Sequence, residues 1–266
     1  TLTLIRDYAE NHLTALTQRS SGVLYAATAG VIKSLAVRLT AFAAAAAPAQ
    51  GTVGHAAAVE GVRWEEAFLA DVLLLALEVL YLLANQDMFD DAAAATVRCA
   101  VGTPMDQVTF QQAADILLFG LDVIAPVLSP VLLRSFPAVA EKYFSFMQYI
   151  LSALGTRFAP WLCANPNVGA AFLRNLTEQL LWGAGAVDAA AARMSLQCLQ
   201  LLGSFHLNAL VRGEHGFQIL LAPEYGQSSL FSDTLRRLLE MIIFPGTSDY
   251  GIAWDRVDAC ANAFIT

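Results

Sequence analysis

Apolar positions along the chain recur at the three- and four-residue steps of an α-helix, and period-two alternation typical of strands is absent. Glycine and proline gather in a few segments that separate the apolar runs. We therefore expect an all-α fold without a sheet. The pattern predicts about nine helices in helix–loop order, over residues 2–18, 23–47, 64–85, 106–127, 137–154, 167–182, 188–207 and 229–244, and from near residue 253 onwards.

Several of the predicted helices are apolar on two faces. Between residues 64 and 85 one row of apolar side chains is formed by Phe68, Val72, Leu75, Val79 and Leu82, and a second by Leu73, Ala76, Leu80 and Leu83. A helix with two apolar rows packs on two sides, which favours stacked helix pairs over one closed bundle. We therefore predict that residues 1–266 form one segment of a right-handed, HEAT-repeat-like α-solenoid cut from a longer superhelix.

The lengths of the expected loops determine the expected length of the repeat. Pairing the fourth helix with the fifth, the sixth with the seventh and the eighth with the ninth gives a step of roughly 50–67 residues, longer than a HEAT repeat of about 40–47. The surplus falls in three expected loops, at residues 48–62, 87–105 and 210–227. Gly155 is expected to cap a helix C-terminus, and Asp188 a helix N-terminus. The expected core includes Leu117, Leu121, Tyr143, Met147, Leu196 and Leu199.

Composition narrows the class of protein. The chain is 57% hydrophobic with a mean hydropathy of +0.53, yet its longest apolar stretches contain Lys33 and Arg38, or Asp71 and Glu78. Charges are rare in membrane-spanning helices, so a soluble helical protein is favoured over a membrane-embedded bundle. The net charge of −8, with only two lysines, gives no basic surface for nucleic acid and suits a basic protein partner.

Residues that often carry chemistry are scattered. The sequence contains neither a Gly-x-Ser-x-Gly nor a phosphate-binding Gly-x-x-x-x-Gly-Lys motif. The well-separated cysteines indicate free thiols in a reducing compartment, and the histidines lack ligand spacing. We expect no catalysis, no metal and no cofactor, with Cys198 and His206 as packing residues. These residues are Cys99, Cys163, Cys198, Cys260, His12, His55, His206 and His215.

Carboxylates interrupt two of the most apolar helices. Asp71 and Glu78 lie seven residues apart and so share a helix face, and Asp115 and Asp122 repeat this spacing. One interpretation is a solvent-exposed stripe. The other places Asp71 and Glu78 on an acidic concave surface, because the second helix of each HEAT pair lines that side. On this interpretation Glu78 and Asp71 are the candidate cargo-binding residues.

One region resembles a known family. The order of five segments is similar to the C-terminal part of exportin-four-type nuclear export receptors, in the importin-β (karyopherin) superfamily. The resemblance spans residues 64–207 and consists mostly of packing residues; exportin-seven-type receptors share the layout. The segments are LLLALEVLYLL at 73–83, AADILLFGLDVIAPVL at 113–128, FPAVAEKYFSFMQYI at 136–150, FLRNLTEQLLWGAG at 172–185 and ARMSLQCLQLL at 192–202.

The resemblance implies a transport function. Such a receptor binds protein cargo together with the small GTPase Ran in its GTP form, mainly through parts that this chain lacks. It contacts nucleoporin Phe-Gly repeats and shuttles between nucleus and cytoplasm. The family's cargo includes a hypusine-bearing translation factor, whose long cationic side chain enters an acidic pocket. The alternative within the same class is another HEAT or armadillo scaffold that binds proteins.

Overall fold

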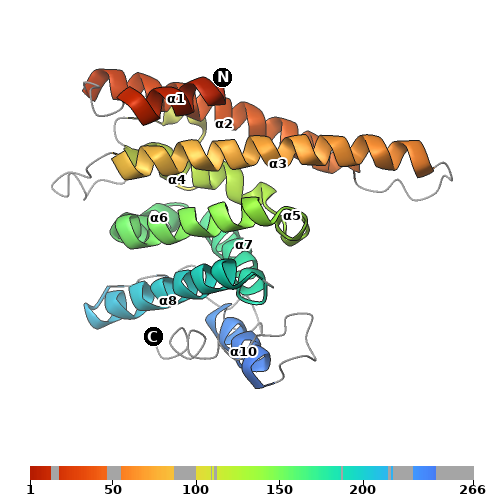
Figure 1. The fold of residues 1–266 in the computed structure, drawn as a ribbon. Coiled ribbons are helices and arrows are strands. Elements are labelled where there is room, and N and C mark those ends of the chain that lie inside the picture. Colours follow the sequence, from red (N-terminus) through yellow and green to blue (C-terminus); the bar gives the residue numbers. More distant parts are fainter. Residues whose placement is uncertain are drawn as a thin grey trace. The chain divides into compact units, whose positions relative to one another are not determined.

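The computed structural model describes residues 1–12, 18–46, 55–86, 100–108, 110, 113–186, 188–214, 217 and 230–243. Nine α-helices and no strand occur in these ranges, which confirms the expected all-α class (Figure 1). The chain divides into two compact units. Unit 1 comprises Thr1–Met88 and Thr109–Leu128, and unit 2 comprises Phe89–Val108 and Ser129–Thr266.

Unit 1 contains four α-helices and a short 3-10 turn. Helices two apart in sequence pack together, since α1 contacts α3 and α2 contacts α4, while α3 also contacts α4. Gly120 permits the close approach of α4 to α3, because a Cβ at this position would lie 2.7 Å from Leu80 Cδ1. The elements are α1 (Leu2–His12), α2 (Gln18–Ala46), α3 (His55–Gln86), α4 (Ala113–Ile124) and η4 (Ala125–Val127).

Unit 2 is built on an antiparallel hairpin of α6 (Pro137–Cys163) and α7 (Pro166–Ala184). Near the start of α6, the buried Tyr143 hydroxyl donates to Gln179 Oε1 at 2.5 Å. Near its end, Trp161 packs edge-to-face on Phe172, with ring centroids 5.3 Å apart. Because positions advancing along α6 meet positions receding along α7, the two helices run in opposite directions. The other elements are η3 (Met105–Gln107), α5 (Pro130–Ser135), α8 (Ala189–Val211) and α10 (Leu230–Ile243).

Helix α8 runs parallel to α6 and lies beside it (Figure 1). The Cys198 thiol faces the Phe144 carbonyl oxygen at 3.9 Å, and Gln148 Nε2 donates to Gln197 Oε1 at 2.8 Å. Further along, Gly155 leaves room for the Phe205 ring. From Phe144 and Gln148 to Gly155 on α6, the matching positions on α8 move from residues 197–198 to 205, so the two helices run in the same direction. Helices two apart stack here as in unit 1, and α7 also contacts α10.

Several expected helix boundaries are wrong. Residues 20–22, expected as a break, lie inside α2, where Gly22 approaches the Phe110 carbonyl oxygen so closely that a Cβ would sit 3.1 Å from it. The expected loop 48–62 is helical from His55 onwards, since the alanines that follow favour a helix and one internal glycine is tolerated. The expected helix end at residue 154 coincides with a kink, because Leu154 leaves helical geometry (φ −114°, ψ 15°) and a second helical stretch continues α6 to Cys163. Gly155 lacks the positive φ of a left-handed helix cap.

Helix pairing is confirmed in one case and extended in another. The expected pairing of the sixth and seventh predicted helices is confirmed, because α7 contacts α8, and α7 also forms a hairpin with the fifth predicted helix, α6. The helix expected from residue 106 begins at Ala113, and a separate short helix, α5, precedes α6. Of the other two expected loops, the structure describes residues 100–105, in a turn and the start of η3, the end of α8 at residues 210–211, the turn at residues 212–214, and Phe217. The remaining residues of the three expected loops, 48–54, 87–99, 215–216 and 218–227, and the expected helix near residue 253 lie outside the described residues.

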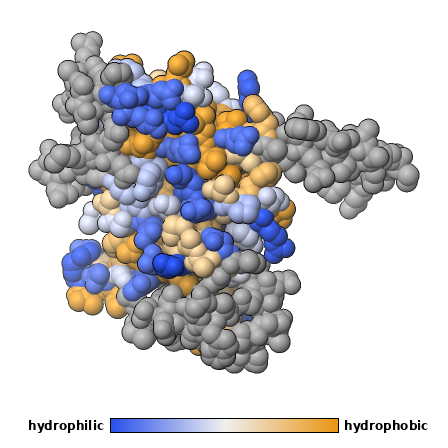
Figure 2. All heavy atoms as spheres, viewed as in Figure 1, coloured by the Kyte–Doolittle hydropathy of each residue, from blue (hydrophilic) through white to orange (hydrophobic). Residues whose placement is uncertain are grey.

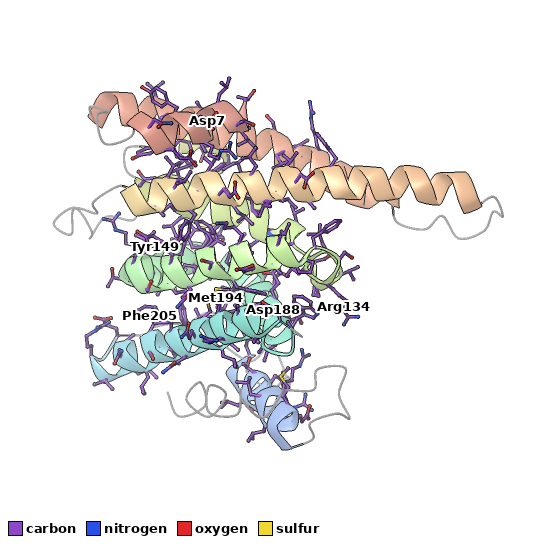
Figure 3. The ribbon with its side chains drawn as sticks, viewed as in Figure 1. Asp7, Arg134, Tyr149, Asp188, Met194 and Phe205 are labelled. Atoms are coloured by element: carbon purple, nitrogen blue, oxygen red, sulfur yellow. The ribbon has the colours of Figure 1, made fainter. Side chains whose placement is uncertain are left out.

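Other expectations are confirmed. Asp188 is the N-cap of α8, where its side chain accepts from Ala191 N at 2.8 Å (Figure 3). The six expected core residues, Leu117, Leu121, Tyr143, Met147, Leu196 and Leu199, are all buried. Within the described ranges, no helix has the length and apolar character needed to cross a bilayer.

Candidate protein-binding surface

The two candidate cargo-binding residues lie on α3, in unit 1. Glu78 is half-buried, with one third of its side chain exposed, and Asp71 is exposed two turns earlier. The carboxylate of Glu78 faces a cation from its own chain, because Arg6 Nη1 of α1 lies 3.9 Å from Glu78 Oε2. Arg6 also forms an ion pair with Asp7, its neighbour on α1, which Figure 3 labels. Asp7 Oδ1 lies 3.1 Å from Arg6 Nη2.

This arrangement changes what Glu78 can do. A carboxylate 3.9 Å from a partly exposed guanidinium forms a weak surface ion pair, since water competes with it and salt screens it. A cationic group of a partner therefore has to share Glu78 with Arg6 or displace it. The hydrogen-bonded pair of Arg6 and Asp7 gives the displaced guanidinium a second carboxylate within the same helix.

Helix α3 contacts the helix before it, α2, and the helix after it, α4, and it stacks on α1. The placement of Glu78 and Asp71 on a concave side stays a prediction. The other acidic pair behaves differently from its expected solvent stripe, because Asp115 is buried in the first turn of α4. A carboxylate at a helix N-terminus is favoured by the helix dipole.

Apolar exposure on α3 was not expected. The row Leu73, Ala76, Leu80 and Leu83 is buried as core, whereas Phe68 of the other row is 67% exposed. Val72, Leu75 and Leu82 of the same row are half-buried. In the coloured part of Figure 2, hydrophobic and hydrophilic side chains intermix over the viewed face. Val79, of the same row as Phe68, is fully buried, so Phe68 alone among the nine residues of the two rows is exposed. The sequence did not reveal this difference, because both rows fit the same helical period.

The residues considered for chemistry sit in packed surroundings. Cys198 is buried, and burial raises the pKa of its thiol, so the reactive thiolate form is disfavoured. His206 is half-buried and accepts a hydrogen bond at Nδ1 from Phe217 N at 3.2 Å. Among the described residues, no three His, Cys, Asp or Glu side chains come together in a way that would hold a metal ion. Cys99, Cys260, His215 and the side chains of His12 and His55 lie outside the description.

Comparison with protein-family models, with characterised proteins and with solved structures finds no match to this chain.

Proposed function

We propose that the chain is a segment of a helical-repeat solenoid that binds other proteins and carries out no reaction. The observation that carries this proposal is the stacking of helices two apart in sequence. In unit 2, α7 returns antiparallel to α6 and α8 lies parallel to α6. In unit 1, α1 contacts α3 and α2 contacts α4. Repeat proteins stack their hairpins in this way and offer extended helix faces to their partners.

The spacing of matched positions supports the repeat. Gln148 and Gln197 are 49 residues apart, and Phe144 and Cys198 are 54 apart. A step of this size is slightly longer than the ~40–47 residues of a HEAT repeat and fits two helices with a long connection. The long α6, which has 27 residues where a helix of about 18 was expected, accounts for part of the surplus.

The resemblance supports a narrower proposal: a nuclear export receptor segment of exportin-four type. Such a segment acts with GTP-bound Ran, binds protein cargo and contacts Phe-Gly repeats while shuttling through the nuclear pore. The best-matching stretch contains Tyr143, Phe144 and Met147, which are fully buried. Because these are packing residues, they support the helical-repeat layout, and the transport role needs a test of its own.

Binding to Phe-Gly repeats gives that test. The purified chain is titrated against an immobilised Phe-Gly repeat peptide and against the same peptide with every phenylalanine replaced by serine. The transport role predicts saturable binding to the first peptide and none to the second. Equal responses to both, or none to either, would contradict a pore-contacting receptor segment.

Cargo recognition by Glu78 is proposed on the same basis, with Asp71 as its neighbour. The hypusine-bearing translation factor is titrated against the Glu78→Gln variant, with Glu10→Gln as the matched control, because Glu10 is an exposed acid on α1. Loss of a desolvated contact to a cation lowers affinity by about 2 kcal/mol or more, mainly through a faster off-rate. Equal affinity of both variants and the unmodified chain at low salt removes Glu78 from the binding surface.

A further inference from the structure

The chain turns sharply where α8 ends. Gly213 has a positive φ of 75°, the left-handed conformation in which glycine commonly ends helices. Its N–H donates to the Leu210 carbonyl at 2.9 Å, and the Glu214 N–H donates to the Ala209 carbonyl at 2.8 Å. Arg212 Nε and Nη2 each lie 3.1 Å from an oxygen of Glu214. These contacts direct the chain back along the last turns of α8.

Phe217 returns to the side of α8 and is held there by His206. The Phe217 N–H donates to His206 Nδ1 at 3.2 Å, and the two rings stack with centroids 6.2 Å apart and an interplanar angle of 16°. Phe217 is completely buried. The same end of α8 carries Phe205, which packs against Gly155 of α6 (Figure 3). We call His206 and Phe217 the α8 latch.

The hydrogen bond of the latch requires a neutral imidazole. A ring nitrogen that accepts a hydrogen bond carries no proton, and protonation would turn the Nδ1 acceptor into a donor that faces the Phe217 N–H. Burial lowers the pKa of His206 below its ordinary value, so the neutral form is favoured in the closed latch. Protonation and closure of the latch are therefore mutually exclusive.

Among the residues that the structure describes, the charged side chains near the latch do not favour a cationic histidine. On α6, Gly155 packs against Phe205 of α8. The buried Arg157, two residues further along α6, therefore lies near the same end of α8 as His206. Within the turn, Arg212 and Glu214 pair with each other. Glu141 and Glu178 are the only carboxylates on α6 and α7, and the helix registers place both nearer the start of α8. Arg174 of α7 is exposed.

We propose that the α8 latch is a pH-sensitive device that releases Phe217 as the pH falls below about 6.5, the ordinary pKa of histidine. Release exposes an aromatic ring at the end of α8 that already presents exposed apolar side chains, Leu207, Leu210 and Val211. The direction of the pH effect follows from the thermodynamic linkage between protonation of His206 and closure of the latch. A histidine whose pKa is lowered in the closed form stabilises that form above pH 6.5 and loses this contribution as the pH falls.

The size of the effect can be stated. If only the open latch takes up a proton, its population relative to the closed form rises by a factor of 1 + 10^(6.5 − pH), which is about 11 at pH 5.5 and about 1.1 at pH 7.5. We therefore expect amide exchange at Phe217, corrected for the intrinsic pH dependence of exchange, to become faster at pH 5.5 than at pH 7.5, by up to about tenfold.

The test is an NMR measurement on the whole chain. Exchange of the Phe217 amide is followed at both pH values in the unmodified chain and in His206→Asn. Asparagine keeps a neutral side-chain acceptor, so exchange in His206→Asn should be insensitive to pH after the same correction. The C2 proton of His206 should titrate below pH 6.5, with the Phe217 amide shift changing at the same midpoint.

Two results would overturn the latch. One is equal pH dependence of the corrected Phe217 exchange in the unmodified chain and in His206→Asn. The other is titration of His206 at its ordinary pKa without a change in the Phe217 amide shift. If His206→Asn folds poorly, the titration of the unmodified chain decides by itself. Both outcomes are independent of whether the chain binds Phe-Gly repeats or cargo.

Discussion

Among the described residues, units 1 and 2 differ in the contacts that hold packed helices together. In unit 2, side-chain hydrogen bonds cross the helix interfaces, from Tyr143 to Gln179 and from Gln148 to Gln197. In unit 1, the close approach of α3 and α4 depends on shape, with Leu80 lying over Gly120. Hydrogen bonds are directional and fix the register of two helices, whereas apolar contacts depend on how well volumes match. The helix interfaces of the two units are therefore expected to tolerate different substitutions.

The largest effect is expected from a volume change in unit 1. Leu80 is fully buried, so Leu80→Ala removes buried methyl groups and leaves a cavity above Gly120, at a cost of about 2–5 kcal/mol in the free energy of unfolding. Leu4→Ala is the control, because Leu4 is 73% exposed and should change stability by no more than about 0.5 kcal/mol. Urea denaturation measures both, and similar losses in the two variants would show that the α3 core face is misassigned.

Adding a single methyl group in unit 2 should have the next largest effect. A Cβ at Gly169 of α7 would overlap the Leu162 carbonyl oxygen, which is backbone and cannot rotate away. We expect Gly169→Ala to cost about 1–3 kcal/mol by overpacking, although alanine is the better helix former. A gain in thermal stability in this variant would mean that α6 and α7 lie further apart at this point.

Removing the buried hydroxyl of unit 2 should cost less. Tyr143→Phe leaves the shape of the interface unchanged and deprives the buried Gln179 of one hydrogen bond, at a cost of about 1–2 kcal/mol. Adding Gln179→Leu should cost less in the Tyr143→Phe variant than in the unmodified chain, because the hydrogen bond between the two side chains is then already lost. Additive losses in this double-mutant cycle would contradict the coupling of the two side chains.

The smallest effect should come from the ion pair of unit 1. Arg6 and Glu78 are each about one third exposed and 3.9 Å apart, a geometry in which surface ion pairs contribute roughly 0–1 kcal/mol. We expect Arg6→Gln to leave the unfolding midpoint nearly unchanged. The same variant should strengthen binding of a cationic partner if Glu78 receives it, because the competing guanidinium is gone. Weaker binding would place Arg6 itself in the contact.

The helical class, most helix positions and much of the core followed from the sequence because apolar periodicity records burial directly. Leu117, Leu121, Tyr143 and Met147 lie on regular stripes and are buried. Boundaries were less predictable where glycine serves a contact with another helix. Gly22 looks like a helix end in the sequence, yet it lies inside α2 beside the Phe110 carbonyl. Gly155 follows the kink at Leu154 and makes room for the Phe205 ring. Such contacts depend on partners far along the chain.

The candidate surface was harder to predict than the core. Phe68 fits an apolar row and is nevertheless exposed, whereas Asp115 fits a polar stripe and is buried. The neighbour of Glu78 could not be found from the sequence, because Arg6 belongs to another helix and no local spacing connects the two. The α8 latch has the same origin, since His206 meets Phe217 only after the chain turns at Gly213.

The central structural claim is that α8 lies parallel to α6, and distances between spin labels test it directly. With the four native cysteines replaced by alanine, labels are placed at Glu141 and Ala190, at Thr156 and Leu207, and at the crossed pair Glu141 and Leu207. All four positions are solvent-accessible. Parallel helices predict similar distances for the first two pairs. The crossed pair spans about 25 Å more along the axis and should be longer by about 10 Å or more. A crossed pair shorter than both of the others would contradict the repeat.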